Sequence, residues 1–320
     1  MTVSRDVQDY YEANTRRFLR YGGAGAATGS LHRSLRMPGA GNARGEINAV
    51  HQVLLDQLAT LGIVPPVLPS RELRPSPRVA DLGCGVGATM QWLVERAGVE
   101  AAGITLSPVQ TAIASARMPP GCRVVTGSFT DAGDLRRMTR GRTVNAAYMI
   151  ESFAHTGDPA AVFRSIQEIT VPGSALLICD DFPTERLLRD TSEPAPDAGP
   201  HRKRIVAPPA RSRPPERSRL NRRLARDFRR GWRIHGFESV RNTAALAERN
   251  GWRLIRTVDL TEFVVTTRLR DYVARSAAIP ARVFGTNRAW WANVVGGAAL
   301  QRLIRRRLVR YAMIVLVREH

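Results

Sequence analysis

Val79-Ala80-Asp81-Leu82-Gly83-Cys84-Gly85-Val86-Gly87 is the stretch of sequence that decides the fold. It predicts a short buried strand and then a sharp, glycine-rich turn into a helix that begins near Thr89. Glycines let the backbone pass close to a ligand, and the amide groups at the start of a helix bind polar or anionic groups. A side chain at Gly83 or Gly85 would block that approach. The stretch therefore indicates a site for a nucleotide-type ligand.

The glycine spacing alone does not separate two classes of nucleotide-binding enzyme. Gly83-x-Gly85-x-x-Ala88 also satisfies the dinucleotide fingerprint of dehydrogenases. A nicotinamide site, however, needs an Asp or Glu about 20 residues after its glycines to bind the ribose. The next predicted strand, residues 99–104, ends instead in Thr105-Leu106-Ser107-Pro108-Val109-Gln110. Asp81 also occupies a position that is usually apolar in nicotinamide enzymes, so both features disfavour a dehydrogenase.

These residues resemble S-adenosylmethionine-dependent methyltransferases, in which a carboxylate at the position of Asp81 orients the amino-acid end of the cofactor. Gly103-Ile104-Thr105-Leu106-Ser107-x-x-Gln110 is similar to one branch of that superfamily, the cyclopropane-fatty-acid, sterol and terpenoid C-methyltransferases. The resemblance implies S-adenosylmethionine as cofactor. It implies that the residues that bind it are Tyr11, Asp81, Gly83, Cys84, Gly85, Gly87, Thr105, Leu106, Ser107, Gln110, Ser128 and Phe129.

A second part of the resemblance lies at the end of the fourth predicted strand, in Ala146-Ala147-Tyr148-Met149-Ile150-Glu151-Ser152-Phe153-Ala154-His155. Sterol and prenyl-chain methyltransferases carry a Glu directly after this strand. The resemblance implies that Glu151 is catalytic, as a base or as a stabiliser of a carbocation, and that His155 assists it or contacts the substrate. The alternative is that Glu151 only caps a helix or pairs with an arginine. The chain departs from the geranyl diphosphate methyltransferase pattern here, where Asn-Glu-Ser is expected.

Strand and helix patterns alternate along the chain, as a parallel sheet requires. The predicted strands are residues 79–82, 99–104, 123–126, 144–150, 175–179, 252–260 and 308–318. We expect an α/β fold, the class I methyltransferase Rossmann-like seven-stranded sheet with a helical cap. The expected units are an N-terminal helical cap at 1–68, an S-adenosylmethionine-binding core at 69–184, an Arg/Pro-rich flexible insertion at 185–235, and a segment at 236–320 that completes the sheet and carries cap helices at about 266–305.

Several residues outside the core are candidates for substrate contact. Aromatic residues at helical spacing predict an amphipathic helix over residues 7–21. The resemblance to sterol-type enzymes implies that Tyr10 and Tyr11 close over the cofactor, and packing on the core is the alternative. The glycine-rich loop at 22–45 is expected to form a lid or part of the substrate pocket. If the substrate carries a diphosphate, we expect His32, Arg33 or Arg36 to bind it, with Mg²⁺ as a further cofactor. An uncharged prenylated substrate would leave these residues without a ligand role.

Methylation of an alkene leaves a carbocation that water would quench, so the substrate needs a dry pocket lined by aromatic rings. Packing in the hydrophobic core is the alternative for most of the candidate rings. Asp180 and Asp181 end the fifth predicted strand on the ligand side of the sheet, where they would bind substrate or metal or pair with arginines. The candidate rings are Tyr11, Phe153, Phe182, Phe263, Trp290 and Trp291.

Composition limits the other classes of function. The net charge of +20 comes almost wholly from arginine, because Lys203 is the only lysine, and we interpret it as the mark of a GC-rich genome. Aromatic residues are too scattered for a nucleic-acid stacking platform, and the three cysteines lack metal-ligand spacing. No apolar run is long enough to cross a bilayer, and no signal peptide is evident. We therefore expect a cytoplasmic protein without nucleic-acid or membrane partners and without a metal site of its own, and leave homo-oligomerisation open.

The sequence thus predicts a C-methyltransferase that acts on an alkene of a prenyl or terpenoid substrate in terpenoid secondary metabolism. The substrate is either a prenyl diphosphate or a prenylated natural product. One alternative is an O- or N-methyltransferase of a small natural product, with His155 and Glu151 as its base. Another is a lipid cyclopropane synthase, which shares the Thr-Leu-Ser-x-x-Gln signature. A non-enzymatic binding protein is disfavoured because the glycine turn is intact.

Overall fold

The computed structural model describes residues 3–21, 28–65, 76–191, 216–265 and 289–320. At its centre is a seven-stranded sheet with the order β3-β2-β1-β4-β5-β7-β6. β7 runs antiparallel to β5 and β6, and the pairs among β1 to β5 are parallel. This arrangement confirms the predicted Rossmann-like, seven-stranded fold.

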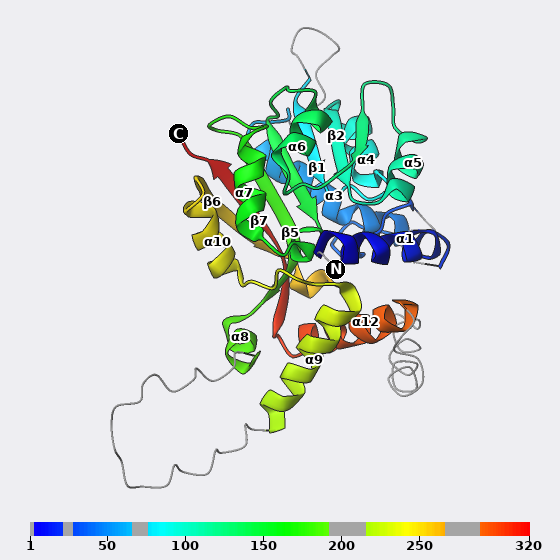
Figure 1. Cartoon of the computed structure of the whole chain (residues 1–320), viewed down its shortest axis with the longest axis vertical. Coiled ribbons are helices and arrows are strands. Elements are labelled where there is room, and N and C mark those ends of the chain that lie inside the picture. Colours follow the sequence, from blue (N-terminus) through cyan, green and yellow to red (C-terminus); the bar gives the residue numbers. More distant parts are fainter. Residues whose placement is uncertain (1–2, 22–27, 66–75, 192–215, 266–288) are drawn as a thin grey trace.

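Strands and helices alternate through the core, and a group of further helices lies outside it (Figure 1). The strands are β1 (Arg78–Leu82), β2 (Glu100–Thr105), β3 (Arg123–Thr126), β4 (Ala146–Ile150), β5 (Ala175–Pro183), β6 (Trp252–Asp259) and β7 (Val309–Arg318). The helices are α1 (Val3–Tyr21), α3 (Ala43–Thr60), α4 (Ala88–Ala97), α5 (Pro108–Ser115), α6 (Ala132–Thr139), α7 (Pro159–Gln167), α8 (Glu185–Thr191), α9 (Glu216–Trp232), α10 (Val240–Glu248) and α12 (Ala289–Arg305), with the 3-10 turns η1 (Phe153–His155) and η2 (Thr261–Phe263).

Local sequence explains where the core helices begin. Ser107 and Asp158 cap the starts of α5 and α7, each accepting a hydrogen bond from a backbone amide three residues on, and a proline follows each cap. The central strands are buried on both faces, β5 along its whole length, as expected for a parallel sheet covered by helices. Their carboxyl ends therefore meet at one edge of the sheet, and α1, α9 and α12 lie beyond that edge (Figure 1).

The register of the sheet brings chemically active side chains to this edge. Asp81 of β1 pairs with Tyr148 of β4, and Ile150, which precedes Glu151, pairs with Cys179. Because β7 is antiparallel, its first residues lie beside the last residues of β5, and Asp181 pairs with Tyr311. The start of the last strand therefore contributes to the same edge as the ends of the others.

The segment at 185–235, expected to be a flexible insertion, contains two helices. Residues 185–191 form α8 and residues 216–232 form α9. Leu224, Ala225 and Phe228 are buried, and α9 packs against α12. A narrow apolar stripe at helical spacing runs between the many arginines of this segment and was not recognised from the sequence. This stripe packs α9 against the protein.

Outside the sheet, α12 packs against both α9 and α1. α9 and α12 cross where Gly231 meets Gly296, since a Cβ atom at Gly231 would lie 2.3 Å from the backbone oxygen of Ala292. The Tyr10 hydroxyl joins α1 to α12 by donating a hydrogen bond of 2.7 Å to Asn293. Within the described ranges, none of the helices has the length and hydropathy needed to cross a membrane.

The close crossing of α9 and α12 makes Gly231→Ala destabilising. The added methyl group overlaps the α12 backbone, an overpacking that costs about 1–3 kcal/mol. We expect Tm, measured by calorimetry, to fall by several degrees. The matched control is Gly297→Ala, where the nearest atom to the added Cβ, in the Trp232 side chain, is 3.7 Å away. Equal Tm values for the two variants would show that the helices do not depend on this contact.

Candidate active site

A cavity of about 420 Å³ opens at the carboxyl edge of the sheet, with α1 forming one of its walls. Its size is within the range of small-molecule sites. The structure brings together on its wall all but one of the residues expected to bind the cofactor. They are Tyr11, Asp81, Gly83, Cys84, Gly85, Thr105, Leu106, Ser107, Gln110, Ser128 and Phe129; Gly87 is not on the wall.

The glycine turn after β1 is left-handed at three positions, with φ of 89° at Gly83, 54° at Gly85 and 79° at Gly87. Glycine adopts this conformation without strain. A Cβ atom at Gly83 would lie 2.5 Å from Cβ of Ser152, the second residue after β4. Packing against Ser152 therefore requires a glycine at position 83. The close approach of a ligand, expected from the sequence, is a second reason for a glycine there.

Asp81 is buried near the end of β1, on the cavity wall. Burial raises its pKa to about 7, because a charged carboxylate loses hydration there. A cationic ligand group, such as an ammonium, would restore the balance in favour of the ionised form. The position therefore suits the amino-acid end of S-adenosylmethionine.

Gln110 ties α1 to the core beside the cavity. Its amide oxygen accepts a hydrogen bond of 2.6 Å from the Thr105 hydroxyl, and its Nε2 donates one of 3.1 Å to Thr15 of α1. The expected cofactor-binding glutamine is thus also a structural link. Neither contact uses the second hydrogen on Nε2.

Glu151 lies directly after β4 and contributes to the cavity wall. Its φ of 52° is left-handed, a conformation that is rare for a non-glycine residue and concentrates at functional sites. Its Oε1 atom accepts hydrogen bonds from the backbone nitrogen of Arg33 at 3.0 Å, from Arg33 Nε at 2.9 Å and from the Tyr311 hydroxyl at 3.1 Å. No described residue donates to Oε2, so this is the oxygen that Glu151 offers to the cavity.

Arg33 links Glu151 to Asp181. Its Nη1 and Nη2 donate to the two carboxylate oxygens of Asp181 at 2.9 and 2.6 Å, the bidentate geometry that guanidinium favours. The guanidinium carbon also lies 4.3 Å from the centre of the Tyr311 ring. Glu151, Arg33 and Asp181 form a buried ionic cluster in which one cation serves two carboxylates, so its net charge is negative when both are ionised.

The charge of Arg33 decides the ionisation of Glu151. Burial alone would raise the pKa of Glu151, but the charge and hydrogen bonds of Arg33 bring it below its ordinary value. Neighbouring Asp180 accepts hydrogen bonds from the backbone nitrogens of Ala154 and Asp181, and burial raises its pKa to about 7. Because the pKa of Glu151 lies below its ordinary value, Glu151 is an anion at neutral pH.

The two histidines on the cavity wall are held as neutral rings. Nδ1 of His155 faces the Arg233 backbone oxygen at 3.1 Å and must donate to it, so Nε2 accepts the hydrogen bond of 2.8 Å from Tyr11. By the same logic, His32 donates from Nδ1 to the Arg33 backbone oxygen and accepts at Nε2 from His51, at 2.7 Å. Burial lowers the pKa of both His32 and His155.

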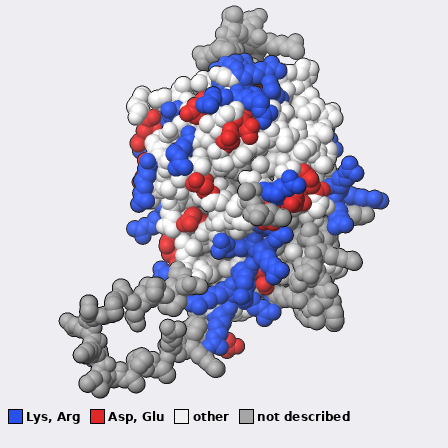
Figure 2. All heavy atoms as spheres, in the orientation of Figure 1, with Lys and Arg blue, Asp and Glu red and all other residues white. Residues whose placement is uncertain are grey.

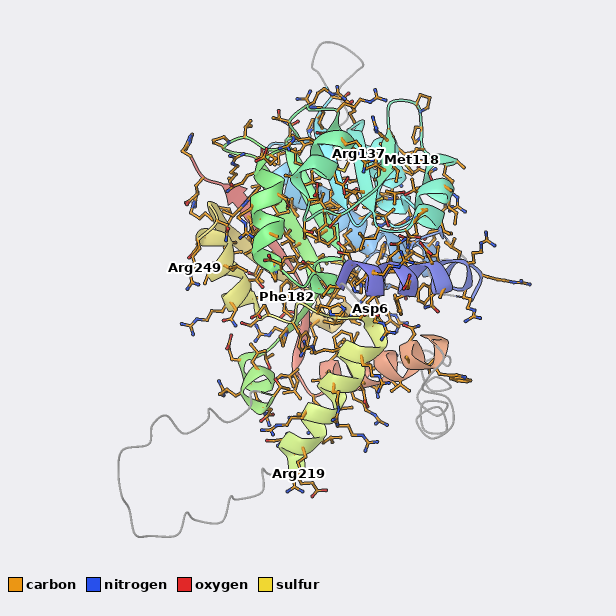
Figure 3. The ribbon with its side chains drawn as sticks, viewed as in Figure 1. Asp6, Met118, Arg137, Phe182, Arg219 and Arg249 are labelled. Atoms are coloured by element: carbon orange, nitrogen blue, oxygen red, sulfur yellow. The ribbon has the colours of Figure 1, made fainter. Side chains whose placement is uncertain are left out.

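Several residues expected to contact substrate are not on the cavity wall. The Tyr10 hydroxyl binds Asn293, the ring of Phe153 packs 6.0 Å from that of Phe163, and Phe182 is buried in the core at the end of β5 (Figure 3). Phe263 packs partly buried against the core, and the Trp290 side chain is outside the described residues. Tyr11 and Phe129 are the aromatic rings on the described part of the wall.

Tyr311 was not predicted from the sequence to lie at the site. This residue lies near the start of β7, and its hydroxyl and ring both contact the ionic cluster. A signal was available, because an antiparallel last strand places its first residues at the ligand edge. Val3, Ser4 and Val7 of α1 were also not identified as part of the cavity wall.

Comparisons with known proteins identify methyltransferases as the relatives of this chain. A family model described as a methyltransferase domain matches residues 50–257. An O-methyltransferase of Pyrenophora dematioidea is 35% identical over 130 residues, covering 39% of this chain and 46% of that protein. The 24-methylenesterol C-methyltransferase 3 of Arabidopsis thaliana is 24% identical over 196 residues, covering 60% of this chain and 46% of that protein. The chain thus spans less than half the length of these two relatives.

A solved structure has the same fold over nearly the whole chain. It is the geranyl diphosphate C-methyltransferase of Streptomyces coelicolor, in complex with Mg²⁺, geranyl diphosphate and S-adenosyl-L-homocysteine. The TM-score is 0.57 at 15% identity, covering 99% of this chain and 98% of that one. The family match and the shared fold confirm the class I methyltransferase that was predicted from the glycine turn together with Asp81, residues 103–110 and Glu151.

The raised pKa of Asp81 predicts how cofactor binding depends on pH. If the ionised carboxylate receives the ammonium group of S-adenosylhomocysteine, the affinity for this ligand should rise about tenfold from pH 6 to pH 8 as Asp81 loses its proton. Titration calorimetry measures this. Asp81→Asn should bind more weakly and flatten the dependence. Without ligand, the folded protein favours protonated Asp81, so the free energy of unfolding falls as pH rises from about 4 to 7. Asp81→Asn should therefore be more stable than the parent at pH 8. If the affinity of Asp81→Asn for S-adenosylhomocysteine depends on pH as strongly as that of the parent, Asp81 does not have this role.

Proposed function

We propose that this chain, which belongs to the family of methyltransferase domains, is an S-adenosylmethionine-dependent C-methyltransferase. Its acceptor would be an alkene in a prenyl or terpenoid compound. The residues on the cavity wall fit the cofactor: Asp81 would receive its ammonium group, and the glycine turn and residues 105–110 would enclose it. When bound, S-adenosylmethionine supplies a methyl group on a sulfonium, which is electrophilic enough to react with an alkene.

The observation that carries the proposal is the ionised Glu151 carboxylate, fixed by Arg33 and Tyr311 on the cavity wall. In alkene methylation the π electrons form the new C–C bond as the C–S bond breaks, which leaves a positive charge on the other alkene carbon. Loss of a proton then gives the product alkene. A carboxylate already oriented toward this developing charge stabilises the transition state without reorganisation.

The same geometry disfavours O-methylation. A general base for a hydroxyl group works best with a pKa near the operating pH, and the pKa of Glu151 is shifted the other way. His155 is not available either, because its accepting nitrogen is taken by the Tyr11 hydroxyl. A carbocation is a far stronger acid than an alcohol, so even weakly basic Glu151 can accept a proton from it.

Tyr11 and α1 contribute by shielding the site. The Tyr11 hydroxyl donates its hydrogen to His155, so it does not donate a hydrogen bond into the cavity. The lone pairs of its oxygen are not used in this bond. Burial raises the pKa of Tyr11 well above its ordinary value, which keeps the phenol neutral. Val3 and Val7 add apolar surface to the same wall. Exclusion of water prolongs the life of a cation.

Glu151→Gln tests the proposal. Gln keeps the shape of the side chain but removes its charge, so we expect the rate of C-methylation to fall by about 10² to 10³-fold. Methyl-labelled S-adenosylmethionine is incubated with geranyl diphosphate, farnesyl diphosphate, prenylated indoles and unsaturated lipids, and the labelled atom is identified by NMR. The product also shows whether a new alkene or a cyclopropane forms.

The matched control is Glu168→Gln, which removes a carboxylate that pairs with Arg136 on the surface. This variant should retain full activity, and both variants should bind S-adenosylhomocysteine like the parent. Label on oxygen or nitrogen, or full activity of Glu151→Gln, would contradict the proposed reaction.

A further inference from the structure

The charges on the cavity wall bear on which acceptor can enter. Among the described residues that line the cavity there is no Arg or Lys, and the ionisable acids are Asp81, Glu151 and Asp158. The histidines there, His32 and His155, are neutral because burial lowers their pKa. A diphosphate is a multiple anion that proteins bind with guanidinium, ammonium or metal ions. The described wall supplies none of these cations.

The arginines expected to bind a diphosphate are engaged elsewhere. Arg33 directs Nε to Glu151 and its two terminal nitrogens to Asp181. Its positive charge is exceeded by the carboxylates around it. The Arg36 side chain is 62% exposed and donates to Glu46, so it is not directed at the cavity.

Many arginines of the described residues lie on the outer surface. Arg219, Arg223, Arg226 and Arg230 are exposed along α9, and arginines are visible over this helix in Figure 2. Arg219 is at the far end of α9, away from the sheet (Figure 3). The net charge of the chain therefore does not describe the charge of its cavity.

The described residues form no preassembled cage for a metal ion. Across the described ranges, no group of three or more His, Cys, Asp or Glu side chains is placed to hold a metal. Glu151 has one oxygen committed to Arg33 and Tyr311. Mg²⁺ that arrives with a diphosphate needs only one or two carboxylates beside the phosphate oxygens, so the comparison of ligands below is made with and without Mg²⁺.

We infer that the acceptor is an uncharged prenylated compound that enters without a diphosphate. The inference rests on the proposed function and narrows its substrate class. Arg33 sets this specificity as a positioning residue: it orients Glu151 and holds it ionised, and it is not a ligand for a phosphate. The negative cluster then repels an anionic headgroup while it favours the cation formed during methylation.

Binding of a matched pair of ligands tests the inference independently of catalysis. Geraniol, 3-geranylindole and geranyl diphosphate carry the same prenyl chain, and only the last carries a diphosphate. Each is titrated by calorimetry into protein saturated with S-adenosylhomocysteine, with and without Mg²⁺. We expect at least one uncharged ligand to bind about tenfold or more tightly than geranyl diphosphate. Tighter binding of geranyl diphosphate, in either buffer, overturns the inference.

Asp181→Asn provides a gain-of-binding test. The variant removes one carboxylate from Arg33 and keeps an oxygen that can accept a hydrogen bond, so the cluster becomes neutral overall. We expect the affinity for geranyl diphosphate to rise several-fold relative to the uncharged ligands. Arg36→Gln should change neither affinity. A loss of geranyl diphosphate affinity in Arg36→Gln would identify Arg36 as a phosphate ligand and overturn the inference.

The two proposals fail in different ways. If the uncharged ligands bind but methyl label never reaches carbon, the proposed reaction is wrong and the charge selectivity stands. If none of the prenyl ligands binds to correctly folded protein, the inference fails with the substrate class. The parent protein alone decides the main comparison, so the outcome does not depend on the folding of Asp181→Asn.

Discussion

The rest of the site depends on the sharing of one buried guanidinium between two carboxylates. Arg33 comes from the segment before α3, Glu151 follows β4, and Asp181 lies near the end of β5. Tyr311 of β7 adds a hydrogen bond to the same carboxylate oxygen. Burying charges is costly unless they are paired and hydrogen-bonded. The cluster therefore joins four segments that are distant in sequence and sets the electrostatic character of the cavity.

The sheet explains why these segments can meet. Parallel β1, β4 and β5 all end at one edge, and antiparallel β7 begins there. The cofactor-binding candidates follow β1 and β2, and the ionic cluster follows β4 and β5, so the cavity has one part suited to the cofactor and another suited to the reacting carbon. α1 closes over both, held to the first by Gln110 through Thr15 and to the second by His155 through Tyr11.

Much of this arrangement could be predicted from sequence because it depends on short, local patterns. The glycine turn after β1, the Thr105–Gln110 segment and the position of Glu151 after β4 are all consecutive stretches. The partners of Glu151 could not be predicted with the same certainty, because Arg33, Asp181 and Tyr311 meet only through long-range topology. Arg33 was one of three residues expected to bind a diphosphate if the substrate carries one, because sequence shows a cation but not its nearest anion. The aromatic candidates Phe153 and Phe182 similarly could not be distinguished from core residues before packing was known.

Sharing of a single cation also constrains how this site can change during evolution. Replacement of Arg33 would leave two carboxylates buried without a counter-ion, and replacement of Glu151 or Asp181 would alter the ionisation of the other. Effects at contacting charged residues are strongly non-additive. Positions 33, 151 and 181 are therefore expected to be epistatic, so that descendants with a different acceptor chemistry arise through coordinated substitutions rather than through independent single steps.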